Sequence, residues 1–165
     1  DDVIMLTRDG RAMRFAAAEV RRMGRQATGV RGIRLREGDE VVSLDAVDDG
    51  KTLFIATANG FGKRCEFKDF TRHSRGGQGM IGIKGADRNG AVVAAHAVSD
   101  DESIICMTSD QMMVRSRVAD FQVQSRLARG VRLVRLNEGA TLVSVSVCES
   151  AEEPAAEPPA SPEAQ

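Results

Sequence analysis

The sequence repeats itself three times with a period of about fifty residues, and this periodicity leaves few folds open. Three short segments align at offsets of 50 and 51, namely Leu6–Gly10, Ala56–Gly60 and Met107–Gln111. The same offsets bring five further sets into register: Arg14, Arg64 and Arg115; Val20, Phe70 and Phe121; Arg25, Arg75 and Arg126; Gly29, Gly79 and Gly130; and Arg34, Lys84 and Arg135. Self-similarity at a fixed period of this length predicts a row of small units that pack on one another.

Each repeat has the pattern of four short strands. In the first repeat an apolar run ends at Thr7 and meets an Asp-Gly pair, a strong signal for a tight hairpin turn. Ala16–Arg22 could form a helix, but its counterparts in the other repeats lack that pattern, so no helix is expected there. The predicted strands are Val3–Thr7, Arg11–Phe15, Val30–Leu35 and Val41–Val47; Leu53–Thr57, Phe61–Phe67, Met80–Lys84 and Ala91–Val98; and Ile104–Thr108, Met112–Val118, Val131–Leu136 and Thr141–Val147.

Four strands per fifty residues predict an all-β fold of propeller or pinwheel blades, each an antiparallel sheet. We place the three blades at residues 1–49, 50–100 and 101–148. Because three blades cannot close a ring, we expect the chain to be part of a domain with more blades. Residues 149–165 form an acidic tail rich in Ala, Pro and Glu, with five Glu and no Lys or Arg, and this composition predicts disorder.

The basic residues are concentrated in one part of each repeat. The formal net charge of −1 includes the five tail glutamates, without which residues 1–148 carry +4. Residues 21–36, 71–84 and 122–135, here called the basic segments, hold 13 of the 23 Lys and Arg residues and no Asp or Glu. Basic edges that recur at the blade period predict a stripe of positive potential suited to the phosphates of duplex DNA. The alternative is a solvated charged rim without a partner.

Contact with the DNA backbone fits these residues better than other modes of nucleic-acid binding. The chain contains no Trp or Tyr, which disfavours stacking on single-stranded bases, and no recognition helix is expected for base readout. Arg14, Arg64 and Arg115 could instead form salt bridges between blades. The predicted DNA-binding residues are Arg25, Arg75, Arg126, Arg34, Lys84, Arg135, Arg22, Arg72 and Arg129.

A glycine-rich loop in the second repeat is a further candidate site. Its glycines would allow close approach to a partner, and its amides could face phosphate oxygens. Gly77–Gly82 satisfies the GxGxxG pattern of dinucleotide-binding loops, but a strand is expected after it where such loops need a helix. His73 could lie beside phosphate, whereas His96 is expected within a strand. The loop residues are Ser74, Arg75, Gly76, Gly77, Gln78 and Gly79.

The remaining reactive side chains suggest no chemistry. Cys65, Cys106 and Cys148 are widely spaced, so we expect small buried hydrophobes and neither a metal site nor a disulfide. No nucleophile, base and orienting group recur together, so no catalytic residue is expected. The methionine-rich stretch Met107–Met113 is expected to fill the core. No apolar run reaches the length of a membrane-spanning helix, and no signal peptide is expected.

The repeats resemble the C-terminal domain of the bacterial DNA gyrase A protein, a β-pinwheel propeller. The resemblance covers residues 3–148, and its most specific pieces are Thr57–Arg64, Gly79–Lys84 and Arg88–Gly90. One loop of the first blade in that family carries the gyrase box, Q-[RK]-R-G-G-[RK]-G. The loop Ser74–Gly79 is similar to it but incomplete, so the resemblance implies the last three of six blades with the box blade upstream. The matched positions are Arg75, Gly76, Gly77 and Gly79; Gln78 replaces the second basic residue, His73 and Ser74 replace the leading pair, and degenerate copies lie at Arg25 and Gly29 and at Arg126 and Gly130.

The resemblance also implies a function. Domains of this family wrap duplex DNA around a basic outer edge with positive handedness, so that the holoenzyme, a type II topoisomerase, introduces negative supercoils with ATP. Such enzymes cleave DNA with a tyrosine, and this chain has none. Cleavage would therefore lie elsewhere, ATP and Mg would bind other domains, and no cofactor is expected here. The implied partners are double-stranded DNA, the rest of the gyrase A protein and the gyrase B protein in a heterotetramer, in the bacterial cytoplasm at the nucleoid and without a membrane.

Three other interpretations remain open. The equivalent C-terminal domain of topoisomerase IV also lacks a proper box, and upstream sequence would separate the two. A propeller adaptor would bind protein and show weak DNA binding that is insensitive to salt. A catalytic propeller is disfavoured by the lack of convergent acid and base groups. The five tail glutamates could, in addition, compete with phosphate for the basic edge.

Overall fold

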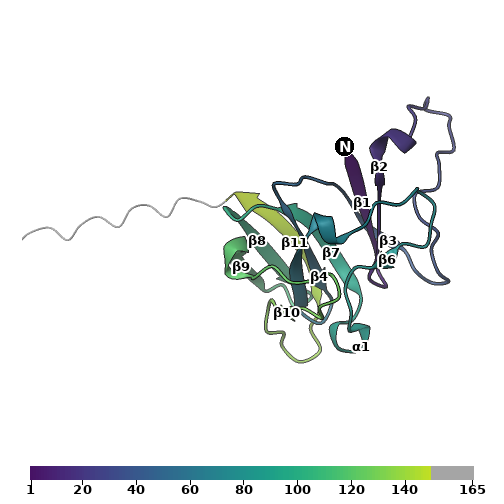
Figure 1. Cartoon of the computed structure of the whole chain (residues 1–165). Helices are drawn as coiled ribbons and strands as arrows, with labels where there is room; N and C mark the ends of the chain where they lie inside the picture. Colours follow the sequence, from purple (N-terminus) through teal and green to yellow (C-terminus); the bar gives the residue numbers. More distant parts are fainter. Residues whose placement is uncertain (150–165) are drawn as a thin grey trace, which may run out of the picture.

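A computed structural model describes residues 1–149, which form three antiparallel sheets with single helical turns between strands (Figure 1). The predicted acidic tail lies outside the described residues except for Glu149, which ends the last strand. The elements are β1 (Asp2–Thr7), β2 (Arg11–Ala16), η1 (Ala17–Glu19), β3 (Val41–Ala46), β4 (Thr52–Thr57), β5 (Phe61–Glu66), η2 (Phe67–Asp69), β6 (Met80–Ile81), α1 (Ala86–Asn89), β7 (Val92–Val98), β8 (Glu102–Thr108), β9 (Met113–Arg117), η3 (Val118–Asp120), β10 (Val131–Arg132) and β11 (Leu142–Glu149).

The fold is a β-propeller of three repeats, as predicted, but the second and third repeats each donate a strand to the blade before them. The sheet orders are β3-β1-β2-β6, β10-β5-β4-β7 and β11-β8-β9. Strand β6 comes from the second repeat and pairs with β2 of the first, with Ala12 opposite Met80. Strand β10 comes from the third repeat and pairs with β5 of the second, with Gly62 opposite Val131. Within residues 1–149 the third sheet has three strands.

The prediction that each repeat contains a third strand of its own sheet is therefore wrong, both in the sheet to which the strand belongs and in the length of the strand. Met80–Lys84 and Val131–Leu136 contribute only two paired residues each, to the neighbouring sheet. Val30–Leu35 is not a strand at all. By the same pattern its partner would be the second strand of a preceding repeat, and residues 1–149 contain none. Instead, Arg34 N donates to Gly77 O at 2.7 Å, which places this segment against the glycine-rich loop.

The same turn joins the first two strands of every repeat. Gly10 and Gly60 both have φ of 81°, a left-handed conformation that glycine adopts without a steric penalty, and Gln111 takes the equivalent position at φ 68°. A single 3-10 turn then follows the second strand, closed by the amides of Val20, Phe70 and Phe121. The sequence does not predict this turn, because one isolated turn leaves no helical periodicity.

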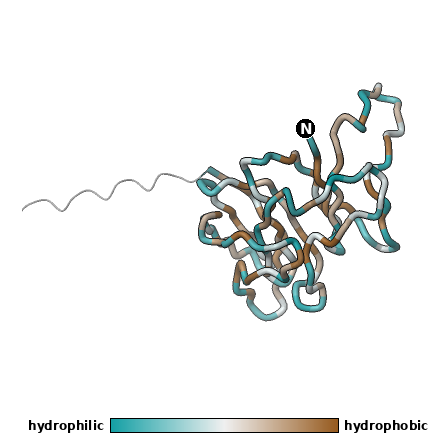
Figure 2. The backbone as a smooth tube through the Cα atoms, viewed as in Figure 1, coloured by the Kyte–Doolittle hydropathy of each residue, from teal (hydrophilic) through white to brown (hydrophobic). Residues whose placement is uncertain are grey.

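The two larger hydrophobic cores lie between adjacent blades. One core joins the first two sheets around Leu6, Ile55 and Phe67, and a second joins the last two around Phe54 and Ile104. Figure 2 shows hydrophobic residues recurring along the strands, while the long outer loops are mostly hydrophilic. Each blade thus depends on its neighbour for burial, as expected for a repeat protein.

The methionines of the third repeat do not fill the core, contrary to the prediction. Met107, Met112 and Met113 are 39%, 53% and 60% exposed. Met112 and Met113 occupy the positions of Phe61 and Gly62, which β10 covers in the second sheet. No strand covers the corresponding edge of β9 within residues 1–149, so these side chains face solvent.

Two of the three cysteines, together with His96, take the expected places. Cys65 and Cys106 are buried in the two cores, where burial raises the pKa of their thiols to about 12 and about 11, and Cys148 is half-buried. His96 lies in β7, and its Nε2 contacts Val145 O at 2.8 Å. Within residues 1–149 no helix has the length and hydropathy needed to cross a membrane.

Candidate nucleic-acid interface

Strand exchange places two of the basic segments at the outer edge of the blades. Strand β7 contacts both β3 and β11, so these three strands, each at one end of its sheet order, lie on the inner side of the arrangement. Strands β6 and β10 are outermost in their sheets, and they belong to the basic segments 71–84 and 122–135. The basic segment of one repeat therefore borders the blade of the preceding repeat.

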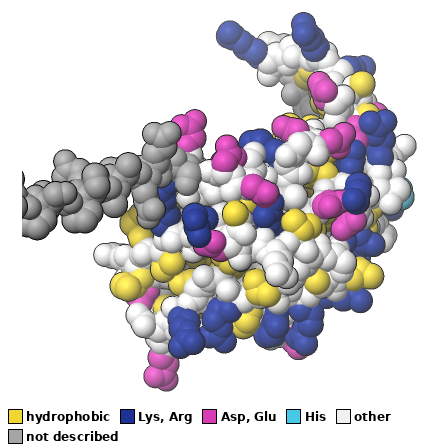
Figure 3. Space-filling view, turned by 60° about the vertical axis from the view of Figure 1, so that its left-hand side comes forward, with side chains coloured by type: hydrophobic (Ala, Val, Ile, Leu, Met, Phe, Trp, Pro, Cys, Tyr) yellow, Lys and Arg dark blue, Asp and Glu magenta, His cyan; other side chains and the backbone are white. Residues whose placement is uncertain are grey.

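Five of the predicted DNA-binding residues have free side chains. Arg34, Lys84 and Arg135 occupy equivalent positions and are exposed, and Arg22 and Arg25 are exposed in the loop after η1. Among the described residues, none of these five side chains has an ion-pair or hydrogen-bond partner. Figure 3 shows Lys and Arg side chains gathered along the lower border of the molecule. Cations without internal partners contribute fully to the positive potential that attracts a polyanion.

Arg75 and Arg126 tie adjacent blades together through equivalent contacts. Arg75 donates to the carbonyls of Glu19 at 3.2 Å and Arg31 at 3.1 Å. Arg126 donates to the equivalent carbonyls of the second repeat, those of Asp69 at 3.1 Å and Ile81 at 2.6 Å. A guanidinium has five N–H donors, so each keeps donors beyond these two. A phosphate contact remains a prediction for both residues.

Arg72 and Arg129 each pair with a carboxylate of the preceding repeat. Arg72 binds both carboxylate oxygens of Asp2, with Nε to Oδ2 at 3.0 Å. Arg129 Nη2 lies 3.2 Å from each carboxylate oxygen of Asp87. The two arginine side chains are 59% and 51% exposed, so both can still be reached from solvent. Their predicted DNA contacts compete with these pairs.

Arg14 and Arg64 reach the next blade through backbone carbonyls, whereas their ion pairs lie within their own repeats, so the predicted salt bridges between blades are not found for these two residues. Arg14 pairs with Asp2 at 2.8 Å and donates to Phe67 O in η2 of the next repeat at 2.8 Å. Arg64 pairs with Asp100 and donates to Val118 O in η3 of the next repeat at 3.3 Å. Arg115, which no described repeat follows, donates to Glu149 O at 3.1 Å.

A cluster of arginines around Phe61 is not predicted by the sequence. The guanidinium carbons of Arg88 and Arg132 lie 4.3 and 5.3 Å from the centre of the Phe61 ring. Arg88 also donates to Arg129 O at 2.7 Å, so α1 of the second repeat holds the basic segment of the third. In the sequence, Arg88–Gly90 stands out only through the family resemblance. Strand periodicity carries no signal for a contact between Arg88 and Phe61.

The glycine-rich loop Ser74–Gly79 lies against the first repeat. The amide of Arg75 donates to the Glu19 carboxylate at 3.0 Å, and the amide of Gly76 donates to Gly32 O at 2.5 Å. Gly79 has φ of 69°, and a Cβ there would lie 2.5 Å from Ala12 O, so only glycine fits beside β2. Strand β6 follows the loop, in agreement with the rejection of a dinucleotide site. An anion, the Glu19 carboxylate, already occupies one amide of this loop.

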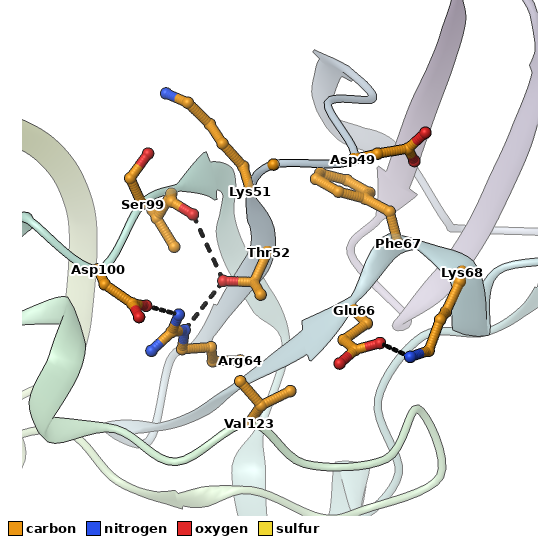
Figure 4. Close-up of a pocket in the computed structure, with 12 residues that line it drawn as sticks. Asp49, Lys51, Thr52, Arg64, Glu66, Phe67, Lys68, Ser99, Asp100 and Val123 are labelled. Atoms are coloured by element: carbon orange, nitrogen blue, oxygen red, sulfur yellow. Dashed lines mark hydrogen bonds and ion pairs between the residues drawn. The ribbon is translucent and has the colours of Figure 1, made fainter.

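A hollow between the second and third blades is a poorer candidate for DNA binding. Figure 4 shows Arg64 directed toward Asp100 and Lys68 paired with Glu66, and both pairs border the hollow. Lys51, which also lines it, lies 3.4 Å from the Glu102 carboxylate. Because each cation has an acidic partner, the hollow lacks the uncompensated charge of the outer edge.

Comparison with known proteins agrees with this architecture. The family model for the DNA gyrase C-terminal domain, beta-propeller, matches residues 1–48, 51–99 and 102–149. The DNA gyrase A protein of Aminobacterium colombiense is 40% identical over 147 residues, which are 89% of this chain and 18% of that protein. Its Escherichia coli counterpart is 40% identical over 145 residues, 88% of this chain and 17% of that protein. The chain thus spans less than a fifth of the length of these relatives.

Solved structures show the same fold. A DNA gyrase A C-terminal domain superimposes with a TM-score of 0.82 at 34% identity, covering 89% of this chain and 50% of the other. The C-terminal domain of a DNA topoisomerase IV superimposes with a TM-score of 0.84 at 23% identity, covering 90% and 47%, and at that identity it speaks for the fold alone. Three matched repeats and relatives at 40% identity lead to one conclusion: the chain belongs to the DNA gyrase C-terminal domain family of β-propellers.

Proposed function

We propose that this chain binds the backbone of double-stranded DNA along the outer edge of its blades and bends the duplex around that edge. The observation that carries the proposal is the position of the acid-free basic segments on the outermost strands, β6 and β10. The equivalent cations Arg34, Lys84 and Arg135 recur once per repeat with exposed, unpaired side chains among the described residues. A duplex that crosses successive blades would meet one such cation at each.

Many weak phosphate contacts suit bending better than one strong site. Bending 20–30 base pairs by 40–90° costs roughly 1–6 kcal/mol. Each neutralised phosphate releases counterions and lowers log K by about 0.9 per tenfold rise in salt. Contacts spread over several blades therefore offset the bending energy and make binding steeply dependent on salt. The blades are also held together by interblade hydrogen bonds from Arg14, Arg64, Arg75 and Arg126. These contacts would keep the curved edge rigid while the DNA is bent.

The activity of the whole protein is part of the same proposal. Because the relatives are DNA gyrase A proteins, we place the chain within a type II DNA topoisomerase that introduces negative supercoils. DNA cleavage, ATP and Mg would belong to other domains, and the rest of the gyrase A protein and the gyrase B protein would be its partners in the bacterial nucleoid. Topoisomerase IV remains the alternative, because Gln78 interrupts the box-like loop, although the relatives at 40% identity are gyrase proteins.

Two measurements on the full chain test the proposal. Affinity for a plain duplex should fall steeply between about 50 and 200 mM salt, by roughly 10³-fold if some six phosphates are contacted. Nicked plasmid that is ligated with the protein bound should show a positive shift in linking number, which reports the wrap and its handedness. Salt-insensitive affinity would favour a protein-binding adaptor, and salt-dependent binding without a shift in linking number would contradict wrapping.

A further inference from the structure

Lys63 is a buried lysine that lies outside the proposed DNA-binding edge. It lies in β5, is 1% exposed, and stands at the position of Met13 in the first repeat and Val114 in the third. An unpaired ammonium in such a place would be costly, since charged groups are almost never buried without partners. The partners of Lys63 therefore indicate what the residue does.

All three polar partners of the Lys63 ammonium are carbonyls from one loop of the third repeat. Nζ donates to Ser125 O at 3.2 Å, to Ala128 O at 3.1 Å and to Arg126 O. An ammonium has three donors, so this loop satisfies it completely. Hydrogen bonds from a charged donor are roughly twice as strong as neutral ones. Through Lys63, the second blade thus holds the basic segment of the third repeat by its backbone carbonyls.

These contacts also fix the direction in which the loop amides point. All peptide bonds in residues 1–149 are trans, and in a trans peptide the N–H points opposite to the C=O of the same unit. Because the carbonyls of residues 125, 126 and 128 face Lys63, the amides of Arg126, Leu127 and Arg129 face away from it. Among the described residues none of these three amides has an acceptor. Outward amides flanked by two arginines attract anions.

The equivalent loop of the second repeat is supported differently. It lies over Met13, which carries no charge, and the amides of Arg75 and Gly76 donate to Glu19 and Gly32 of the first repeat. The first repeat therefore occupies amides there that remain free in the third. In the third repeat the loop is held through its carbonyls by Lys63, and not through its amides. The side of the loop that carries the amides is therefore left open.

We infer that Lys63 is a positioning residue that holds the loop Ser125–Gly130 with its amides and arginines facing the DNA phosphates. This inference rests on the proposed function, because it concerns the same DNA-binding edge. Lys63 touches no phosphate itself and acts through the loop that it supports.

The charge on Lys63 can be removed by pH. Burial lowers the pKa of Lys63 to about 8; the nearby Arg126 also lowers it, while Cys65 and Asp69 raise it. Above pH 8 the ammonium becomes an amine, and the loop carbonyls lose their charged donor. DNA affinity should therefore decrease between pH 7 and pH 9, although the phosphates and the exposed arginines keep their charge across that range.

The test compares Lys63→Met with Lys68→Gln in the full chain. Methionine is the natural residue at the equivalent position 13, and Lys68 is an exposed lysine of the same repeat, so both variants lose one positive charge. Affinity for a plain duplex is measured at pH 7 and pH 9 and at several salt concentrations. Lys63→Met should bind about tenfold more weakly than Lys68→Gln at pH 7, as expected for one lost charged hydrogen bond, and its affinity should no longer depend on pH.

Each outcome decides the inference. Equal affinities of the two variants, with the pH dependence unchanged, would overturn the role of Lys63 while leaving DNA binding intact. Absence of salt-dependent binding by the unmodified chain would instead remove the proposed function. If Lys63→Met fails to fold, the unmodified chain still decides, because an affinity that is flat between pH 7 and pH 9 contradicts a loop held by this ammonium.

Discussion

Arg72 of the second repeat binds both carboxylate oxygens of Asp2 in the first, across the boundary between two blades. The Asp2 side chain is 3% exposed, and it also accepts a hydrogen bond from Arg14 at 2.8 Å. The hydrogen bond from Arg72 holds the pKa of the Asp2 carboxyl below its ordinary value of 3.8, and the Arg14 hydrogen bond lowers it further, against the opposing effect of burial. Arg72, which was predicted to contact DNA, thus takes part in the contact between the first two blades.

Replacing Asp2 with Asn should lower stability and change its dependence on pH. Two arginines lose a charged acceptor, which costs roughly 1.5–3 kcal/mol for such hydrogen bonds. Since the folded pKa lies below the unfolded one, the stabilisation is complete above 3.8 and is lost as the pH falls through the folded pKa. Denaturant titrations of both proteins at pH 7 and at about pH 3 should show a difference that narrows in acid. A constant difference would contradict the ionic contribution.

The free cations of the outer edge should determine the salt dependence of DNA binding. A triple variant, Arg34→Gln with Lys84→Gln and Arg135→Gln, should flatten the slope of log K against log salt by about 2.7 if each touches one phosphate. The matched control, Lys51→Gln with Lys68→Gln and Arg117→Gln, removes the same charge from residues that pair with acids. Equal slopes for the two variants would show that net charge alone governs binding.

Arg75→Ala with Arg126→Ala should act on stability as well as on DNA. Each substitution removes two hydrogen bonds to carbonyls of the preceding repeat. We therefore expect a lower melting temperature, by roughly 2–4 °C for each kcal/mol of stability lost. The salt slope should change less than in the triple variant of the outer edge. An unchanged melting temperature, with the slope reduced by about two, would make these residues pure phosphate contacts.

The repeat and the blade class could be predicted from the sequence, because strand periodicity and hairpin turns are local signals. The exchange of strands could not, since Met80–Ile81 has the same alternation whichever sheet it joins. Arg75 and Arg34 both lie in acid-free segments, yet only the first meets carbonyls of a neighbouring blade. Local charge shows where cations concentrate, but their internal partners are set by packing between repeats.

Glu19→Gln should strengthen DNA binding at low salt. The Glu19 carboxylate accepts the amide of Arg75 at 3.0 Å, where a phosphate oxygen would otherwise compete for the same donor. Removing its charge leaves a weaker acceptor and one less repulsion at the outer edge. Glu138→Gln, an exposed carboxylate in the turn before β11, is the charge-matched control. Tighter binding by the first variant only, seen in fluorescence anisotropy with labelled duplex, supports competition, and equal gains contradict it.

Stability should pass through a maximum near pH 9, for reasons that involve three buried groups. The folded chain loses the proton of Lys63 at about 8, whereas the unfolded chain keeps it up to 10.5, so the pKa differs between the two states. Between these values unfolding takes up a proton, so stability rises by up to about 1.4 kcal/mol per pH unit. Above pH 9 the thiols of Cys65 and Cys106 ionise only in the unfolded chain, because burial raises the pKa of each to about 12 and about 11. Unfolding then releases two protons from the thiols and takes up one at Lys63. Because the net change is a release, stability falls as the pH rises further.

The three groups can be separated by substitution in the same pH series. Lys63→Met should remove the rise between pH 8 and pH 9 and leave the decline above it. Cys65→Ala with Cys106→Ala should remove the decline and let the rise continue toward pH 10. No tyrosine is present to titrate in this range. Between pH 8 and pH 9 stability should rise, because deprotonation of Lys63 removes a buried charge. DNA affinity should fall over the same interval, because the loop Ser125–Gly130 loses its charged donor. Parallel changes in stability and affinity between pH 8 and pH 9 would contradict this assignment.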